Sequence, residues 1–502
     1  MRLFPIFTPA RRWQPVFFPF RNPSFSERLL IWTERAIKGP LFGCRMCGNC
    51  LLQETAFICP MECPKGARNG PCGGSTSEHC YVDETRPCVW YRIYKRAEAM
   101  GREDKLLEVL PPLDWSKTGG ETWGDVVHQV KKLGFGNVAK GLVNASPARR
   151  AETWDSIFRP VRQPDWWRGD AEYHPPAYTE PISGLEAAFR AGEFVITSEV
   201  APPMSTATGQ LRKNINLVKP YVHAINFTDN PSATPRMSSL ACSLIALEEG
   251  AEPVMQIAAR DRTRMSLQAE VIGATALGVR NILCLSGDHA RLGPGPQGRM
   301  DIIDIDSVQM LWILRRMRDE GHYLDGRELK QPPQMFLGAA ASPFASMPRF
   351  QAIREHKKVN AGAQFFQTNL VYDPAGLDVW LDLLGERGVL DKVYILIGVT
   401  PLKSLKVAQY MNDEVPGVSI PAPLMARMEK AARSGKEAEQ EEGVQIALEL
   451  IDAVKDKPGV RGVHLMAVGW ESIVPRLVEE TGLPLPRKQQ PAETAEAGQF
   501  AS

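Results

Sequence analysis

Eight short apolar segments with β propensity recur between residues 194 and 468, and helical segments separate them. The eight cover residues 194–200, 223–229, 252–259, 281–288, 335–341, 365–372, 393–400 and 462–468. Each is a nearly continuous apolar run, as expected for a strand buried on both faces of a parallel sheet. Helical spacing marks the connections, as at residues 261–278 and 304–321. Eight βα units over roughly 300 residues predict an α/β fold of the (β/α)8 TIM-barrel type.

A doubly wound open sheet is the alternative fold. A dinucleotide-binding sheet of that type carries G-x-G-x-x-G after its first strand, and no such sequence follows residue 200. We therefore favour the barrel, whose active site is built where the strands end. The polar residues at the predicted strand ends are Glu199, Thr228, Asp229, Arg260, Asp261, Asp288 and Asn369.

Two carboxylates at strand ends are the main catalytic candidates. Glu199 ends the first buried strand, where partial desolvation raises the pKa of a carboxyl group toward that of a usable general acid. Asp288 ends the fourth strand beside Gly287, which lets the backbone approach a ligand closely. The alternative for each carboxylate is a helix cap or a solvated loop. The glycine-rich segment 289–300 follows, as a lid, a phosphate contact or a plain loop.

A cysteine cluster precedes the predicted barrel and points to metal binding. Its first part is C-x2-C-x2-C, a spacing that lets three thiolates reach three corners of one cube. Cys-Pro follows twice, as it often does at iron–sulfur ligands, and nearby glycines let backbone N–H groups approach the sulfurs. Eight cysteines suffice for two four-thiolate sites. The predicted ligands are Cys44, Cys47, Cys50, Cys59, Cys63, Cys72, Cys80 and Cys88.

Zinc and disulfides are the alternatives for this cluster. Structural zinc favours pairs of C-x2-C, to which the triplet is less suited. A disulfide framework is typical of short secreted chains, whereas this chain has 502 residues. We therefore expect [4Fe-4S] clusters, with zinc second and disulfides or free thiols third. His79 is a candidate extra ligand or a solvated side chain, and Cys242 and Cys284 are expected to be core residues.

The sequence divides into five parts. We expect an N-terminal arm with one helix over residues 1–40, a cysteine-rich metal-binding module over 41–110, and a Trp/Pro-rich connection over 111–185. The connection is predicted to be irregular chain wrapped against another domain. The barrel follows over 186–487, and a polar, disordered tail over 488–502.

Charge and hydropathy exclude several partners. The net charge of +1 gives no support for nucleic-acid binding. No apolar run reaches the ~18 residues that a membrane span needs. The basic, aromatic start lacks a continuous apolar core and a cleavage site, so we expect an arm rather than a targeting segment. A cytoplasmic homo-oligomer is the resulting expectation.

Residues from about 190 to 485 resemble methylenetetrahydrofolate reductase, a flavin-dependent TIM-barrel family. The motifs that carry the resemblance are "SEVAPP", "INFTDNP", "LSGDHA", "DIDSVQML" and "KKVNAGAQFFQTNLVYD", with "IPAPLMARM" as a weaker match. Residues 30–110 resemble the small cysteine-rich partner of this reductase in some anaerobes, which is believed to hold iron–sulfur clusters. That likeness rests on "CGNC", "CPMECPKG" and "NGPCGG".

The resemblance implies roles for particular residues. Glu199 stands at the position of the general acid that protonates N10 of methylenetetrahydrofolate, before reduced flavin delivers hydride to give 5-methyltetrahydrofolate. Asp288 stands at the position of the aspartate that approaches both flavin and pterin. Thr228, Gly287 and Lys358 fall on flavin-contact positions, with FAD or FMN as the cofactor. Electrons would come from NAD(P)H, or through the clusters from ferredoxin or another redox partner.

Four positions depart from the family pattern. Asn369 replaces the glutamine that binds folate, and Leu405 replaces an aromatic residue that stacks on substrate. Ser286 and Ser342 replace an arginine and a tyrosine on the flavin side. Two alternative functions follow, namely a non-catalytic scaffold subunit holding structural zinc and a folate- or corrinoid-dependent methyltransferase.

Overall fold

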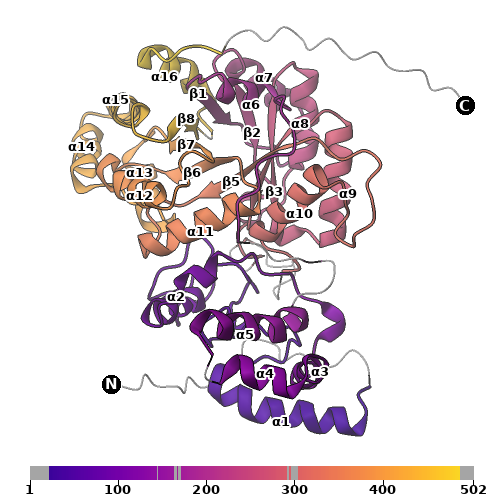
Figure 1. Ribbon diagram of the computed structural model, residues 1–502. Helices are drawn as coiled ribbons and strands as arrows, with labels where there is room; N and C mark the ends of the chain where they lie inside the picture. The colour runs from indigo at the N-terminus through magenta and orange to yellow at the C-terminus, as the bar shows by residue number, and fades with distance from the viewer. Residues whose placement is uncertain are drawn as a thin grey trace, which may run out of the picture.

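The computed structural model describes residues 22–143, 145–162, 167, 171–290, 293–294, 303–415, 417–467 and 469–486. The chain forms a barrel and a smaller N-terminal domain that packs beneath it in the view of Figure 1. The predicted arm before residue 22, most of segment 289–300 and the predicted tail lie outside the described residues. No helix in the described ranges is both long enough and apolar enough to cross a membrane.

The eight predicted strands form a closed, fully parallel barrel in the order β1 to β8. The TIM-barrel prediction is therefore confirmed, and the open sheet is excluded. All eight strands are almost completely buried, which explains their continuous apolar sequences. Their bounds are β1 Val195–Glu199, β2 Ala224–Phe227, β3 Pro253–Ala258, β4 Asn281–Leu285, β5 Phe336–Ala341, β6 Phe365–Leu370, β7 Tyr394–Val399 and β8 Val460–Leu465.

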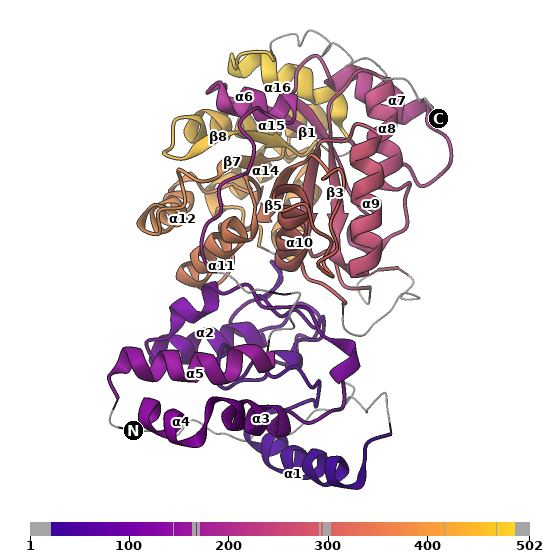
Figure 2. The ribbon, with the colours of Figure 1, turned by 45° about the vertical axis from the view of Figure 1, so that its right-hand side comes forward.

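Helices cover the outside of the barrel (Figure 2). Their starts follow local capping rules, as in α10, where Asp306 accepts hydrogen bonds from the backbone N–H groups of Val308 and Gln309. The bounds are α6 Gly184–Arg190, α7 Gly209–Val218, α8 Ser239–Glu248, α9 Arg264–Ala276, α10 Ser307–Asp319, α11 Pro348–Ala361, α12 Pro374–Glu386, α13 Leu405–Glu414, α14 Ala422–Ala432, α15 Lys436–Lys455 and α16 Val474–Thr481.

Helix α6 closes the amino end of the barrel. Its Leu185 and Phe189 pack with residues from the starts of the strands, and the Phe189 ring stacks on Tyr394 with 4.6 Å between centroids. A separate apolar layer lies between the strands and the outer helices. Because the amino end of the barrel is filled by this cluster, the binding site of the barrel is expected at the carboxyl end of the strands.

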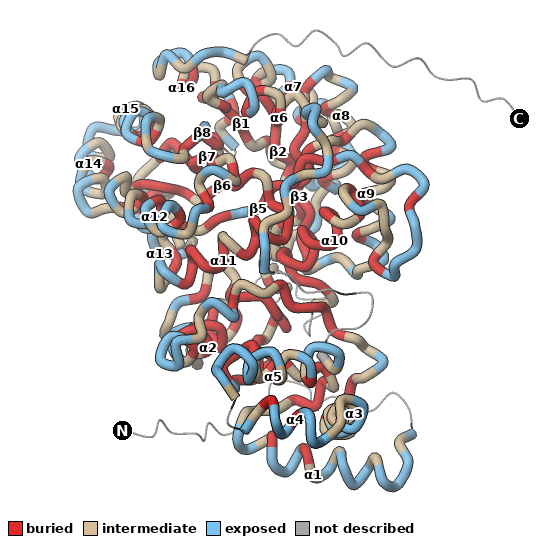
Figure 3. Tube along the Cα trace, viewed as in Figure 1, coloured by how far each residue is buried: buried red, intermediate tan, exposed pale blue. Residues whose placement is uncertain are grey.

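The N-terminal domain lies at that carboxyl end. It consists of helices and cysteine-containing loops, and its face toward the barrel is buried (Figure 3). Its helices are α1 Phe25–Phe42, α2 Val89–Ala99, α3 Trp123–Leu133, α4 Phe135–Leu142 and α5 Pro147–Arg162. Short 3-10 turns occur in this domain at Pro60–Glu62, Glu103–Leu107 and Trp115–Lys117. In the barrel they occur at Pro231–Ala233, Ala259–Asp261 and Glu471–Ile473.

The connecting region differs from the prediction of irregular chain. Residues 123–162 form α3, α4 and α5, because their apolar positions recur at helical spacing and pack the helices on one another. Two tryptophans of the connecting region nevertheless contact the barrel. Trp115 donates a hydrogen bond to Asp304 of the barrel, and buried Trp167 stacks on Trp312 of α10 with 3.8 Å between ring centroids.

Candidate active site and cysteine groups

A cavity of about 330 Å³ lies at the carboxyl ends of β2 to β6. This volume is at the lower end of the range for small-molecule sites. The barrel contributes Thr228, Gln256, Ser286, Gly287, Asp288, Ser342, Arg354, Lys358 and Asn369, among others. The N-terminal domain contributes Lys65, Cys72, Gly73, Gly74 and Tyr81, so the wall belongs to two parts of the chain.

Glu199 is held just behind this wall. Its side chain is 14% exposed, and its carboxyl group interacts with the side chain of Gln256, which lines the cavity. Burial raises the pKa of Glu199 to about 7; Glu471 adds to the rise and the Gln256 bond opposes it. At neutral pH this carboxyl group is therefore present in both protonation states, as proton donation to a ligand requires.

A neutral histidine stands beside Glu199. The Nε2 atom of His464, on β8, lies 4.0 Å from a Glu199 carboxylate oxygen, and Nδ1 lies 2.9 Å from the Thr197 hydroxyl. Burial lowers the pKa of His464 to about 3, so the imidazole carries no charge that would pull the Glu199 pKa down. The amide of Gln367 links Thr197 to Asn226, which forms a polar layer inside the barrel.

The loop after β4 has a conformation that requires glycine. Gly287 has φ of +70°, and an added Cβ would lie 2.9 Å from the Cβ of Ala258. The carboxylate of Asp288 accepts a hydrogen bond of 2.8 Å from the backbone N–H of Ser232. The main-chain carbonyl of Asp288 accepts one of 2.9 Å from Arg260. Asp288 is therefore fixed at the cavity by bonds to the loops after β2 and β3.

Most sequence-predicted site residues gather at this cavity. Thr228, Gly287, Asp288, Lys358 and Asn369 all line it. The ammonium of Lys358 is already paired with Glu355 at 2.7 Å and bonded to the Ala340 carbonyl at 2.6 Å. Burial lowers its pKa to about 8, against the opposing effect of Glu355.

Leu405 lies apart from the cavity lining. It is the first residue of α13, and its backbone N–H bonds to Glu439 of α15 at 3.2 Å. Its side chain packs with the apolar cluster beneath α13 and α14. In this structure the loop residue Val415 lines the cavity instead.

Sequence reasoning missed the cationic side of the cavity. Arg354 of α11 lines it and is buried, with its guanidinium bonded to the side-chain carbonyl of Gln351 at 3.2 Å. Lys65 reaches in from the cysteine-rich region, and its ammonium donates a hydrogen bond to the Gly287 carbonyl. Helical spacing places Arg354 on the same face as Lys358, which was the one available signal for it.

The eight clustered cysteines fall into two groups of four. Cys44, Cys47, Cys50 and Cys59 line one small cavity. Cys63 and Cys72 line a second one, and both interact electrostatically with Cys88. Cys80 interacts with Cys63. All eight are free, and no disulfide joins them. Cys242 and Cys284 are buried in the barrel core as predicted.

The cysteines are not arranged as preformed ligands. Across the described ranges, no three His, Cys, Asp or Glu side chains converge as they would around a metal ion. His79 is exposed, with Nδ1 3.0 Å from the Glu84 carbonyl oxygen. Burial, with the neighbouring cysteines, raises the pKa of Cys44 and Cys63 to about 12, so thiolates there need a positive partner.

The donor set and its surroundings fit a thiolate-bound metal. The ammonium of Lys38 lies 3.9 Å from the Cys50 sulfur and is buried, although it also pairs with Glu34. A buried cation beside a four-cysteine group compensates the negative charge that metal-bound thiolates carry. The four residues of the first group therefore have both the ligand chemistry and a countercharge in place.

Sequence comparison assigns the family. The profile described as methylenetetrahydrofolate reductase matches residues 184–482, and one described as methylene-tetrahydrofolate reductase C terminal matches residues 24–116. The first match covers more than half of the chain. With its closed barrel and a cavity at the strand ends, the chain belongs to the methylenetetrahydrofolate reductase family. A search of curated proteins found no match.

The solved structures that this chain resembles are distant. An uncharacterized protein from Clostridium thermocellum, described as binding two copies of 5-methyl-5,6,7,8-tetrahydrofolic acid, is 15% identical with a TM-score of 0.43; the alignment covers 60% of this chain and 98% of that chain. An F420-dependent secondary alcohol dehydrogenase is 12% identical with a TM-score of 0.37, covering 58% and 98%. A putative deoxyribose-phosphate aldolase from Toxoplasma gondii is 12% identical with a TM-score of 0.31, covering 58% and 96%.

Proposed function

We propose that this protein interconverts 5,10-methylenetetrahydrofolate and 5-methyltetrahydrofolate. The observation that carries the proposal is Glu199, a buried carboxyl group with a pKa of about 7 that contacts the cavity through Gln256. Opening the five-membered ring of the substrate requires a proton on N10, and an acid poised near neutral pH can supply it. Membership of the family supports the same reaction.

The chain's own residues divide the work as follows. Glu199 donates the proton to N10 in the reductive direction and takes it back in the other. Asp288, fixed by Ser232, presents a negative charge to the ring system of a bound pterin or flavin. Asn369 lines the cavity and offers both a donor and an acceptor to the pterin edge.

A flavin, FAD or FMN, would supply hydride to the methylene carbon. Thr228, Gly287 and Lys358 line the part of the cavity that would hold it, and Arg354 and Lys65 add positive charge suited to a phosphate. The glycine at 287 leaves backbone groups accessible, which fits close approach by a flat ring. Ser286 and Ser342 leave room where the family has larger residues.

The second cysteine group borders this cavity. Cys72 lines both the small cavity shared with Cys63 and the large cavity at the barrel mouth. A [4Fe-4S] cluster on Cys63, Cys72, Cys80 and Cys88 would therefore border the flavin site, and a ferredoxin-type donor could deliver electrons through it. If zinc occupied the same position, the N-terminal domain would have a structural role only, and NAD(P)H would be the electron donor.

The Glu199→Gln variant tests the proposed reaction. It should lose folate turnover by at least 10²-fold, in keeping with removal of a general acid, while an artificial donor still reduces its flavin at the wild-type rate. Glu471→Gln is the comparison variant, because it keeps the Glu199 carboxyl group and removes a neighbouring charge, so folate turnover should persist with a shifted pH dependence. Undiminished folate turnover in Glu199→Gln would exclude the assigned acid.

An absorption spectrum of anaerobically purified protein, with iron, sulfide and zinc assays, tests the cofactors. Flavin bands with iron matching sulfide support the cluster route, and flavin with zinc supports the structural role. A colourless protein that takes up no added FAD or FMN and shows no folate activity would favour the scaffold function, for which Ser286 and Ser342 in the cavity wall are the motivating observation.

A further inference from the structure

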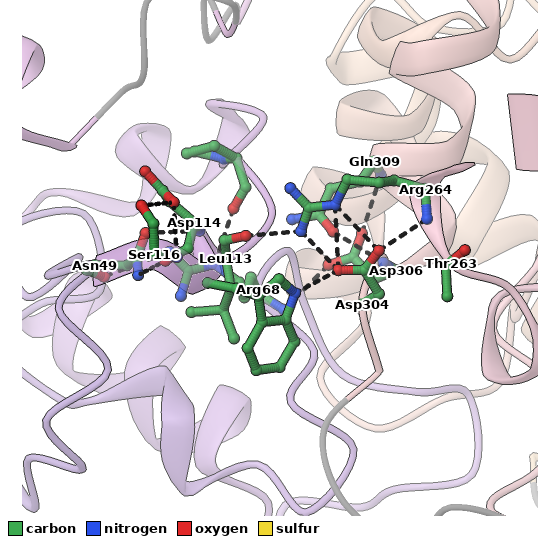
Figure 4. Close-up of polar contacts among 12 residues, drawn as sticks. Asn49, Arg68, Leu113, Asp114, Ser116, Thr263, Arg264, Asp304, Asp306 and Gln309 are labelled. Carbon is green, nitrogen blue, oxygen red and sulfur yellow. Dashed lines mark hydrogen bonds and ion pairs between the residues drawn. The ribbon is translucent and has the colours of Figure 1, made fainter. Parts of the chain in front are cut away.

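The junction between the N-terminal domain and the barrel contains a buried arginine (Figure 4). The backbone N–H of Arg68 donates a hydrogen bond of 3.0 Å to the Asp306 carboxylate, and the Asn69 amide donates another of 3.0 Å to the same oxygen. Asp306 uses its other oxygen to cap α10. The backbone at Arg68 is therefore fixed to the first turn of a barrel helix.

The side chain of Arg68 turns away from that carboxylate. Its Nε donates to the Pro111 carbonyl at 2.8 Å, one Nη to the Met61 sulfur at 3.4 Å, and the other Nη to the Asn49 carbonyl at 3.4 Å. The residue is only 2% exposed. Among the described residues, no carboxylate forms an ion pair with this guanidinium, and a buried charge without a countercharge is strongly unfavourable.

The Asp306 carboxylate balances part of this charge, and the other negative groups that interact with the guanidinium are cysteine sulfurs. Cys47 and Cys59 both interact electrostatically with the guanidinium. Two of the hydrogen-bond partners of the guanidinium, Asn49 and Met61, lie in the same loops as these cysteines. Asn49 is two residues after Cys47, and Met61 is two residues after Cys59. Lys38 approaches the group at a different member, Cys50. Two buried cations thus border one set of four sulfurs.

We propose that Arg68 and Lys38 are positioning residues that supply the countercharge for an anionic metal centre on Cys44, Cys47, Cys50 and Cys59. The inference rests on metal binding by the cysteines, as in the proposed function. It holds for zinc and for iron, because either metal would be bound by the same four negatively charged thiolates. Through its backbone bond to Asp306, Arg68 also attaches this centre to α10 of the barrel.

The test measures metal retention in full-length variants. The second group is first disabled by Cys72→Ser and Cys88→Ser, so that the remaining metal reports on the first group alone. In that background, we expect Arg68→Met to bind metal roughly 10- to 100-fold more weakly, the usual effect of removing an outer partner of a metal site. The measurement is competition against a chromophoric chelator for the iron or zinc that the purified protein carries.

Two variants separate charge from packing. Arg68→Lys keeps the charge and should restore most of the affinity. Arg264→Met is the matched control, because Arg264 also joins the two domains, through the Leu113 carbonyl and the Asp304 carboxylate. It should retain wild-type metal. Far-UV circular dichroism confirms that each variant is folded.

Three results would overturn the inference. They are unchanged metal affinity in Arg68→Met, equal loss in Arg68→Lys and Arg68→Met, and absence of metal from the double-serine background. None of them bears on Glu199, whose folate chemistry is measured separately. Failure here and failure of the proposed reaction are therefore distinguishable.

Discussion

The ammonium of Lys65, in the cysteine-rich region, donates a hydrogen bond of 2.5 Å to the main-chain carbonyl of Gly287, two residues after β4. This bond crosses 222 positions of sequence and joins the two halves of the cavity wall. The N-terminal domain is therefore part of the site, and damage at the junction should affect ligand binding in the barrel.

Lys65→Met tests that connection. A hydrogen bond from a charged group contributes about 1.5–3 kcal/mol, and its loss frees the Gly287 loop. We expect flavin affinity, measured by fluorescence titration, to fall about 10-fold or more. Lys219→Met is the control, since Lys219 makes a comparable bond to the Glu249 carbonyl away from the cavity. Equal flavin affinity in wild type and Lys65→Met would contradict this role.

The pH dependence of turnover should report Glu199. Its pKa is raised to about 7, so the proton-donating form prevails below pH 7 and is lost above it. The value of kcat/KM for methylenetetrahydrofolate reduction should therefore decline as pH rises through about 7. In Glu471→Gln the decline should move to lower pH, because the charge that helps raise the pKa is gone. If the pH profile of Glu471→Gln is the same as that of the wild type, Glu199 is not the group whose titration limits catalysis.

Gly287→Ala should destabilise the protein more than the same change at another left-handed glycine. Both Gly287 and Gly250 have φ near +70°, but only at Gly287 would a Cβ meet a neighbour, Ala258, at 2.9 Å. Overpacking typically adds about 1–3 kcal/mol. Chemical denaturation should show Gly287→Ala losing more unfolding free energy than Gly250→Ala by that amount. Equal losses of unfolding free energy in the two variants would mean that the loop after β4 moves to relieve the contact with Ala258.

Trp167→Ala should weaken the attachment of the connecting region. The Trp167 ring is buried against Trp312, and truncating a buried tryptophan costs about 3–5 kcal/mol. We expect a lower denaturation midpoint and faster proteolysis between residues 143 and 184. Trp154→Ala, at a side chain that is 42% exposed, should change both far less.

Local sequence was sufficient to predict the barrel. Strands such as β3 and β7 read as unbroken apolar runs because both faces are buried, and chain order alone placed Glu199, Asp288 and Asn369 at one end. Helices α3 to α5 were missed because tryptophan and proline dominated the interpretation of that region. Their apolar residues nevertheless recur at helical spacing.

Contacts between distant segments were beyond reach from sequence. Lys65 lies in a cysteine loop, and nothing in its neighbourhood indicates that it bonds to Gly287. The division of the cysteines into two groups likewise depends on how the loops fold back on α1 and α2. His464 looked like one apolar-strand residue among others, because its relation to Glu199 arises only when β8 closes on β1.

The closure of the amino end of the barrel by α6 has a kinetic consequence. With Phe189 and its neighbours filling the amino end, every molecule that reaches Asp288 must enter and leave by the same mouth, which the N-terminal domain narrows. A nucleotide donor and a folate would then have to take turns, and steady-state plots at several donor concentrations would run parallel. A donor that works through the cysteine groups needs no place in the mouth, so excess folate would not inhibit competitively against it.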